Sequence, residues 1–246
     1  MKVNVKPRIL ILGATSSIAQ AAAAEYAKRG YDLILAGRNL SALARIGADL
    51  QIRYQININT QIFETQDIAK HPEFIAQIIR QYGDFTGVLI AVGYLDKSNS
   101  ASVIDPIIKQ NFTGVASLLT LCADYLMNKR SGFIIVLSSV AGDRGRESNY
   151  IYGAAKAGLN IFCQGLRQRC NKFGVRIITV KLGIIDTPMT YGRAGSFLAA
   201  SPLSIAKRLV DLSQGRRNSI YLPWFWRPLL AIICWIPEPL FKRLSL

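Results

Sequence analysis

The sequence predicts an α/β protein built on one doubly wound parallel sheet, and three observations carry this prediction. Short apolar runs rich in Ile, Leu and Val recur along the chain, as expected of strands buried on both faces. Longer segments with apolar residues at helical spacing separate these runs. The length of 246 residues suits a single large domain. We expect that domain over residues 1–222, followed by an apolar C-terminal extension over residues 223–246.

The composition narrows the classes of function. Thirty Lys and Arg residues against fifteen Asp and Glu give a formal net charge of +15, which attracts nucleic acid, anionic lipid or phosphorylated substrates unless it serves solubility alone. The sequence contains no nucleic-acid motif, so a phosphate or a membrane surface is the favoured partner.

The four cysteines show no C-x-x-C spacing and His71 belongs to no ligand pattern, so we expect no metal and free thiols in a reducing cytoplasm. The N-terminal apolar run is too short for a signal peptide.

The chain begins with a strand, a turn of small residues and a helix. Residues 8–12 form the predicted strand, and an Ala-rich helix ending at Gly30 follows the turn GATSSIA of residues 13–19. Small residues at such a turn let backbone amides approach a pyrophosphate at the positive end of the helix. An ordinary structural turn would explain the same residues. The candidate binding residues here are Gly13, Thr15, Ser16, Ser17 and Ile18.

The end of the second strand indicates which dinucleotide would bind. Residues 31–37 form this strand, and Arg38 and Asn39 follow it at once. An acidic residue at this place accepts the adenosine ribose hydroxyls of NAD, whereas an arginine holds the 2′-phosphate of NADP. Arg38 with Asn39 therefore favours NADP(H) over NAD(H), with Ser16 assisting at the phosphate. An exposed loop arginine is the alternative.

The middle of the chain continues the alternation of helices and strands. Predicted elements are a helix over residues 40–54, a strand over 56–64, a helix over 72–82, a strand over 87–92 and a long helix over 101–127. Asn111 falls inside the long helix, where an asparagine competes with backbone hydrogen bonding. Taken alone, Asn111 would be an exposed helical residue.

Three residues in the second half form a pattern typical of proton transfer to a carbonyl. The apolar run of residues 133–139 predicts a strand that delivers Ser139 at the carboxyl edge of the sheet, where sites of open α/β sheets form. Tyr152 and Lys156 are four residues apart, so a helix places them on one face. A free phenol titrates near pH ~10, and a neighbouring ammonium favours the phenolate, so we expect this pair to exchange a proton nearer neutrality.

Together with the small-residue turn and Asn111, the pattern of Ser139, Tyr152 and Lys156 resembles the short-chain dehydrogenase/reductases over residues 8–222. These are single-domain, nicotinamide-dependent oxidoreductases with a Rossmann-type sheet. The resemblance implies an NAD(P)-dependent enzyme acting on CH–OH groups and assembling as a homodimer or homotetramer. It also implies catalytic roles for these four residues, because the family's matching asparagine distorts its helix and holds a water that links the lysine to solvent.

Three motifs depart from the family pattern. Ser17 and Ala19 replace two glycines of G-x-x-x-G-x-G, Ala91-Val92-Gly93 stands where Asn-Asn-Ala-Gly is usual, and Leu182 replaces the proline of P-G-x-x-x-T. The residues that still match imply contacts with the cofactor. Asp67 and Ile68 match the position beside the adenine ring, and Gly93 matches a position where the backbone passes close to a cofactor ribose. Lys156 would bind the nicotinamide ribose with Tyr152 also at the cofactor, and Ile185 and Thr187 would hold the nicotinamide carboxamide.

The last elements are two strands, a lid and an apolar tail. Strands over residues 175–180 and 220–222 complete the sheet, and residues 189–201 are the expected substrate lid. In the tail PWFWRPLLAIICWIPEPLFKRL, Arg227 and four prolines argue against a transmembrane helix. Its tryptophans, with the basic Lys242 and Arg243, fit a segment lying in the bilayer interface. We expect a cytoplasmic protein with peripheral contact at the inner face of the cell membrane; a tail that completes a dimer or covers the sheet edge is the alternative.

Two motifs, one central and one C-terminal, resemble a particular subgroup of this family. SSVAGDRGRESNYIYGAAKAGL and IPEPLFKRL are similar to a subgroup of reductases that act on decaprenylphosphoryl-2-keto-erythro-pentose. That similarity implies reduction of a carbonyl on a polyprenyl-phosphate-linked keto sugar, and Arg144, Arg146 and Arg193 are candidates for its phosphate. A family member acting on a lipid, steroid or acyl carbonyl or alcohol is one alternative. A non-catalytic, nucleotide-sensing scaffold is the second.

Overall fold

A single parallel sheet organises the chain. The structure, a computed structural model, describes residues 6–96, 98, 100–190 and 199–244. Seven strands lie in the order β3-β2-β1-β4-β5-β6-β7, and every neighbouring pair is parallel. They are β1 (Arg8–Leu12), β2 (Asp32–Gly37), β3 (Ile58–Ile62), β4 (Gly87–Ile90), β5 (Gly132–Ser139), β6 (Val175–Leu182) and β7 (Ser219–Leu222). The predicted Rossmann-type, doubly wound sheet is confirmed.

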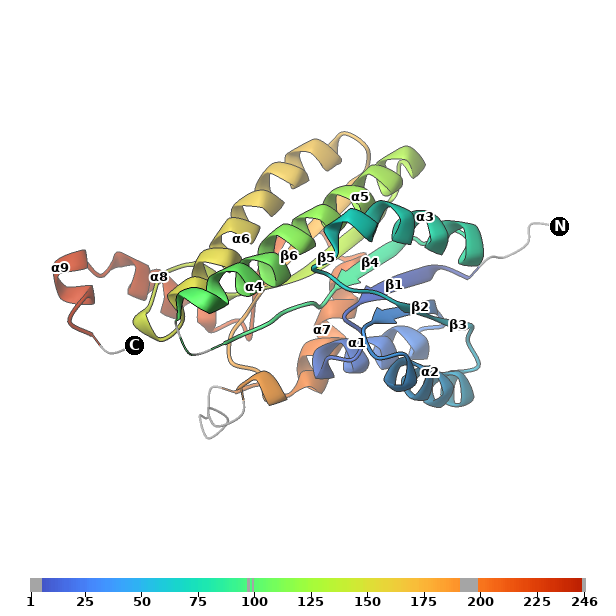
Figure 1. The fold of residues 1–246 in the computed structure, drawn as a ribbon, viewed down its shortest axis with the longest axis horizontal. Coiled ribbons are helices and arrows are strands. Elements are labelled where there is room, and N and C mark those ends of the chain that lie inside the picture. The colour runs from blue at the N-terminus through green and yellow to red at the C-terminus, as the bar shows by residue number, and fades with distance from the viewer. Residues whose placement is uncertain (1–5, 97, 99, 191–198, 245–246) are drawn as a thin grey trace.

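Helices cover both faces of this sheet (Figure 1). One face carries α1 (Ser17–Lys28), α2 (Leu40–Tyr54) and α7 (Pro202–Gln214), and the other carries α3 (His71–Tyr82), α4 (Ile104–Ile108), α5 (Gly114–Lys129) and α6 (Tyr150–Asn171). Successive strand residues supply the two cores, because side chains alternate across a sheet. Ile9 and Ile11 pack beneath α1 and α7, whereas Leu10 and Leu12 pack beneath α3 and α5.

The long helix predicted over residues 101–127 exists, but it is not regular. A 3₁₀ turn over Ala101–Val103 precedes α4, and a π-helical turn over Lys109–Thr113 separates α4 from α5. Asn111 lies in that π turn. A π turn inside an α-helix often marks a functional site, because it re-aims side chains.

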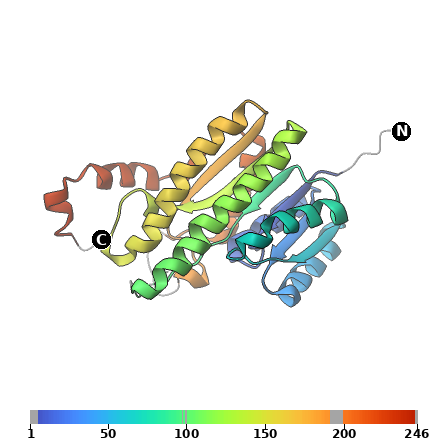
Figure 2. The ribbon, with the colours of Figure 1, turned by 45° about the horizontal axis from the view of Figure 1, so that its top comes forward.

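The C-terminal tail leaves the domain as two short helices, α8 (Trp226–Trp235) and α9 (Glu238–Phe241) (Figures 1 and 2). The break between them falls at Ile236 and Pro237, where proline prevents the helix from continuing. Within the described residues, no helix combines the length and apolarity needed to span a bilayer.

Candidate active site

The carboxyl ends of the strands surround a cleft of about 380 Å³. It lies where the strand order reverses between β1 and β4, which is the usual ligand position in open α/β sheets. Ten of the predicted site residues line this cleft: Gly13, Thr15, Ser16, Ser17, Ile18, Arg38, Gly93, Tyr152, Lys156 and Thr187. The fold therefore gathers residues from both halves of the chain around one cavity.

The turn after β1 forms the floor of the cleft. Gly13 has a φ of +79°, and a Cβ at this position would lie 2.9 Å from the Ala91 carbonyl oxygen, so only glycine fits without a shift. Ser16 caps α1 by accepting a hydrogen bond from the Ala19 amide at 3.2 Å. The first turn of α1 contains no acidic residue, so its positive end is open to an anion.

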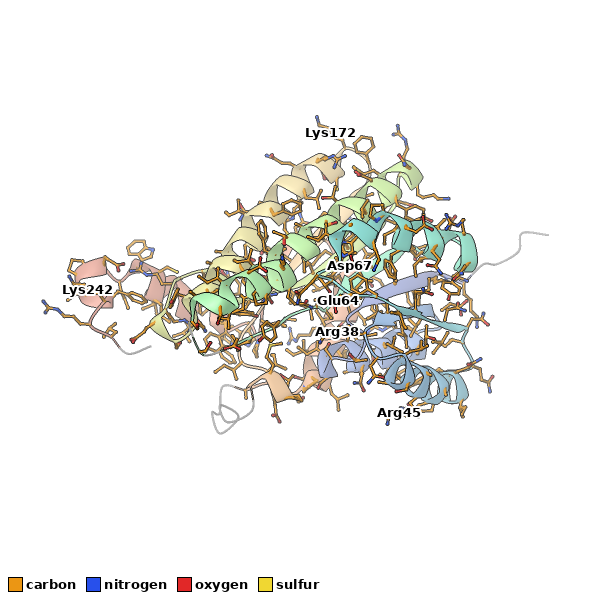
Figure 3. All side chains as sticks on the ribbon, in the orientation of Figure 1. Arg38, Arg45, Glu64, Asp67, Lys172 and Lys242 are labelled. Atoms are coloured by element: carbon orange, nitrogen blue, oxygen red, sulfur yellow. The ribbon has the colours of Figure 1, made fainter. Side chains whose placement is uncertain are left out.

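Arg38 lies at the end of β2, on the side of the cleft away from Tyr152 and Lys156. Its side chain is 72% exposed, and its Nε lies 3.9 Å from the Glu64 carboxylate (Figure 3). An ion pair this long and this exposed contributes little to stability, so Arg38 remains able to meet a ligand.

Three residues predicted to bind cofactor do not line the cleft, and two of them have other partners. Asn39 caps α2 by accepting a hydrogen bond from the Ala42 amide at 2.9 Å. Asp67 lies 2.6 Å from the Lys70 ammonium, and neither Asp67 nor Ile68 lines the cleft. Figure 3 shows Asp67 on the far side of Glu64 from Arg38. The sequence pattern located these residues near the cleft, but local capping and ion pairing engage the Asn39 and Asp67 side chains.

Helix α6 and strand β5 bring together three of the four predicted catalytic residues, Ser139, Tyr152 and Lys156. Lys156 is 2% exposed, its Nζ donates to the Leu137 carbonyl at 3.2 Å, and the same Nζ lies 5.6 Å from the centre of the Tyr152 ring. Ser139 is the last residue of β5, and its Oγ accepts a hydrogen bond from the Ala141 amide at 3.1 Å. The Ser139 Oγ also donates to the Leu182 carbonyl at 3.4 Å, and Ser139 lies close enough to Tyr152 to lower the pKa of that phenol. The arrangement places one hydroxyl, one phenol and one ammonium at the carboxyl edge of the sheet.

The prediction that the pKa of Tyr152 lies nearer neutrality is wrong in this structure. Burial raises the pKa of Tyr152 to about 12, although the nearby Ser139 hydroxyl lowers it. Burial also lowers the pKa of Lys156 to about 8. Desolvation of the charged form is the largest cause of both shifts. Tyr152 is therefore a protonated phenol at neutral pH.

Asn111 is a buried residue with a fixed side chain. Its Oδ1 accepts from the Tyr94 amide at 3.1 Å, and its Nδ2 donates to the carbonyls of Tyr94 at 2.7 Å and Ile107 at 2.9 Å. It is 0% exposed, so the alternative of an exposed helical asparagine is wrong. These bonds tie the π turn to the segment that follows Gly93 and β4.

Neither Arg144 nor Arg146, two of the three predicted phosphate-binding arginines, lines the cleft. Arg144 donates to the carbonyls of Cys234 and Ile236 and lies 2.7 Å from the Glu238 carboxylate, so it holds the tail. Arg146 is half-buried outside the cleft, and Arg193 lies outside the described residues, as does most of the expected lid. The assignment of Arg144 to substrate is wrong because its donors are engaged by the end of α8.

The segment after β6 closes the far side of the cleft. Thr187 lines it, whereas Ile185 is buried and pairs with Ala200 in a short parallel bridge. A Cβ on Gly183 would overlap the Trp226 indole of the tail. The tail therefore packs directly behind this segment.

Sequence reasoning missed several lining residues. Most extend strand ends that the sequence did locate, and the others are Gln110 and Pro188. They are Gly37, Phe63, Thr65, Ala91, Val92, Gln110, Leu137, Ser138, Leu182 and Pro188, whereas Met189, which also lines the cleft, belongs to the predicted lid. Parallel-strand topology could have predicted the strand-end residues, because carboxyl ends meet at one edge. Gln110 carried a weaker signal, a polar side chain next to Asn111.

The fold and the cleft define a dinucleotide-binding α/β protein. A family model described as short chain dehydrogenase matches residues 7–194. An uncharacterized oxidoreductase of Mycobacterium tuberculosis is 29% identical over 241 residues, with 96% of each chain covered. Another from Streptomyces coelicolor is 31% identical over 243 residues, covering 96% of this chain and 95% of its own. The solved structure of ElxO with NADP bound has a TM-score of 0.79 at 21% identity, covering 90% of this chain and 99% of its own.

The chain thus belongs to the short-chain dehydrogenase family. The prediction of an NAD(P)-dependent oxidoreductase is confirmed at this level. Among the described residues, no group of three or more His, Cys, Asp or Glu side chains is placed to hold a metal ion.

Proposed function

We propose that the protein is an NADPH-dependent reductase that converts a ketone into a secondary alcohol. The observation that carries this proposal is the meeting of Ser139, Tyr152 and Lys156 beside the cleft that also contains the Gly13 turn and Arg38. Bound NADPH supplies a hydride to the carbonyl carbon. The compact Gly13 turn and the acid-free N-terminus of α1 support binding of the cofactor's pyrophosphate.

The residues have separate roles in this proposal. Tyr152 donates its phenolic proton to the oxygen on which negative charge develops, and Ser139 donates a hydrogen bond to the same oxygen. The Lys156 ammonium stabilises the phenolate that remains and binds the nicotinamide-side ribose. Asn111 fixes the π turn and holds a water through which Lys156 exchanges protons with solvent.

Arg38 supports NADP(H) over NAD(H). It is the cation at the end of β2, and a 2′-phosphate there would compete with the weak contact to Glu64. The test is cofactor titration of wild type and Arg38→Ala. We expect the Kd for NADPH to rise roughly 10- to 100-fold, as loss of a charge-assisted pair implies, and the Kd for NADH to stay within about twofold. Equal losses for both cofactors would remove the assignment.

For the substrate, we favour a carbonyl on a polyprenyl-phosphate-linked sugar, with a lipid, steroid or acyl carbonyl as the second class. The apolar tail behind the segment containing Thr187 supports a lipid-linked substrate of either kind. The test is NADPH oxidation with a short-chain prenyl-phosphate ketosugar, the same sugar lacking the lipid and phosphate, and a steroid ketone. Turnover of the first alone supports the sugar, and turnover of the third alone contradicts it.

The tail supports peripheral attachment to the inner face of the cell membrane. Trp224, Ile232 and Trp235 are 69%, 67% and 89% exposed, and Lys242 and Arg243 follow them. Exposed apolar side chains beside cations suit an anionic bilayer interface. A cytoplasmic homodimer or homotetramer formed through another face remains compatible, and sedimentation velocity without lipid tests it.

Vesicle cosedimentation tests the attachment. The wild type is expected to bind vesicles containing phosphatidylglycerol and to bind phosphatidylcholine vesicles less. The double variant Ile232→Ser, Trp235→Ser should lower the partition coefficient at least about tenfold, because burial of each apolar side chain is worth about 1.5–3 kcal/mol. Ile52→Ser is the matched control, since Ile52 is 81% exposed on α2. Equal binding by the double variant and the control would contradict attachment through the tail.

A further inference from the structure

One buried polar atom in the cleft has no partner within the described part of the chain. Gln110 lines the cleft and is 6% exposed, yet its side-chain Oε1 accepts no hydrogen bond from any described residue. Its neighbour Asn111, in the same π turn, makes three side-chain hydrogen bonds. Buried amide oxygens are nearly always paired, so an orphaned one facing a ligand cleft calls for a ligand donor.

The position of Gln110 indicates which part of a ligand it meets. Gly114 lies one turn further along the same face, and a Cβ there would overlap the carbonyl of Thr65, so the π turn packs on the segment just after β3. Thr65 and Phe63 line the cleft together with Arg38 at the end of β2. Tyr152 on α6 and Thr187 after β6 belong to the part of the sheet beyond β5, away from β2 and β3 in the strand order. Gln110 therefore lies on the side of the cleft where Arg38 would hold the adenosine 2′-phosphate.

The residue expected to contact the base is turned elsewhere. The Asp67 carboxylate lies 2.6 Å from Lys70 and does not line the cleft. The adenine ring presents a 6-amino donor beside a ring-nitrogen acceptor, and a primary amide matches such an edge with one acceptor and one donor. We propose that Gln110 recognises the adenine base of the dinucleotide, its Oε1 accepting a hydrogen bond from the 6-amino group. This inference rests on the proposed binding of a nicotinamide dinucleotide.

The test compares NADPH with its hypoxanthine analogue, in which a carbonyl replaces the 6-amino group. Binding is followed by nicotinamide fluorescence for wild type, Gln110→Met and Arg38→Ala. We expect the wild type to bind NADPH about tenfold more tightly than the analogue. Gln110→Met, similar in length but without the amide, should bind both equally and lose about tenfold for NADPH only. Arg38→Ala is the matched control, which weakens both cofactors and keeps the tenfold preference.

Thermal unfolding without cofactor keeps the result interpretable. Gln110→Met removes an unpaired buried acceptor, so its Tm should equal or exceed that of the wild type. A preference for NADPH that survives in Gln110→Met, or equal wild-type affinity for the two cofactors, would overturn the assignment while leaving cofactor binding intact. Failure of the wild type to bind either cofactor would instead overturn the proposed function, and this inference with it.

Discussion

Helix α6 and the C-terminal tail both depart from the rule that charged side chains are exposed and apolar side chains are buried. Helix α6 buries a charge, whereas the tail exposes large apolar side chains. On α6, a lysine is buried to 2% exposure among apolar neighbours, and its pKa falls to about 8. In the tail, Trp235 is 89% exposed, although an indole gains free energy by burial. A buried charge and an exposed aromatic each reduce stability, so both regions are expected to retain these residues for function. The difference lies in the ligand expected: a small polar cofactor at α6 and an apolar surface at the tail.

The largest expected effect comes from removing the Tyr152 hydroxyl. Tyr152→Phe should lower kcat by about 10³-fold or more, because general acid catalysis and orientation are both lost. The Kd for NADPH, measured by fluorescence, should change less than about threefold. Near-normal turnover by Tyr152→Phe would show that the α6 face is not the chemical site.

The second largest effect is expected from replacing Lys156, where activity and stability should change in opposite directions. Lys156→Met should lower kcat by about 10²-fold, since the phenolate loses its cation, and raise the free energy of unfolding at pH 7 by about 1 kcal/mol, since a buried charge is removed. In the wild type, the unfolded chain holds a proton between pH about 8 and 10.5 that the native lysine has released, so stability should rise with pH across this window.

Urea unfolding at several pH values measures this linkage. Lys156→Met should show no such rise, and Lys172→Met, at the exposed C-cap of α6, is the matched control (Figure 3). A less stable Lys156→Met protein with retained activity would mean that Lys156 supports the fold and not the reaction.

The pH dependence of turnover also tests whether the reaction requires the Lys156 cation. Lysine is cationic below its pKa, so kcat for reduction should be level below pH about 8 and fall by about tenfold per pH unit above it. Tyr152, with a pKa of about 12, remains a proton donor over this whole range. A pH–rate profile of steady-state reduction measures this, and a rate that rises between pH 8 and 10 would contradict the role of the Lys156 cation.

The smallest effect on turnover is expected from replacing Arg144, which joins the segment after β5 to the C-terminal tail. Arg144 lies 4.2 Å above the Phe241 ring and donates to two carbonyls at the end of α8. Arg144→Met should speed tryptic cleavage in the tail by about tenfold, because local opening becomes easier, and leave kcat within about twofold. Glu238→Gln, which removes one exposed ion pair, should change cleavage less than about threefold. Unchanged cleavage in Arg144→Met would show that other contacts hold the tail.

Periodicity and strand-end logic predicted the sheet, the α6 pair and the turn at Gly13, because these features depend on local sequence. The sequence could not reveal the partner of Arg144, since Cys234 and Glu238 lie about ninety residues away. It also misassigned the pKa of Tyr152, because spacing on a helix gives proximity but not burial. Asn39 was foreseeable as a helix cap, since asparagine before a helical segment is a strong capping signal.

The most direct test is a fluorescence titration of the purified wild-type protein with NADPH and NADH. We predict saturable, micromolar binding of NADPH with enhanced nicotinamide emission, and NADH binding at least about tenfold weaker. Binding of neither cofactor would contradict the claim that the cleft between Arg38 and Tyr152 is the active site of a reductase.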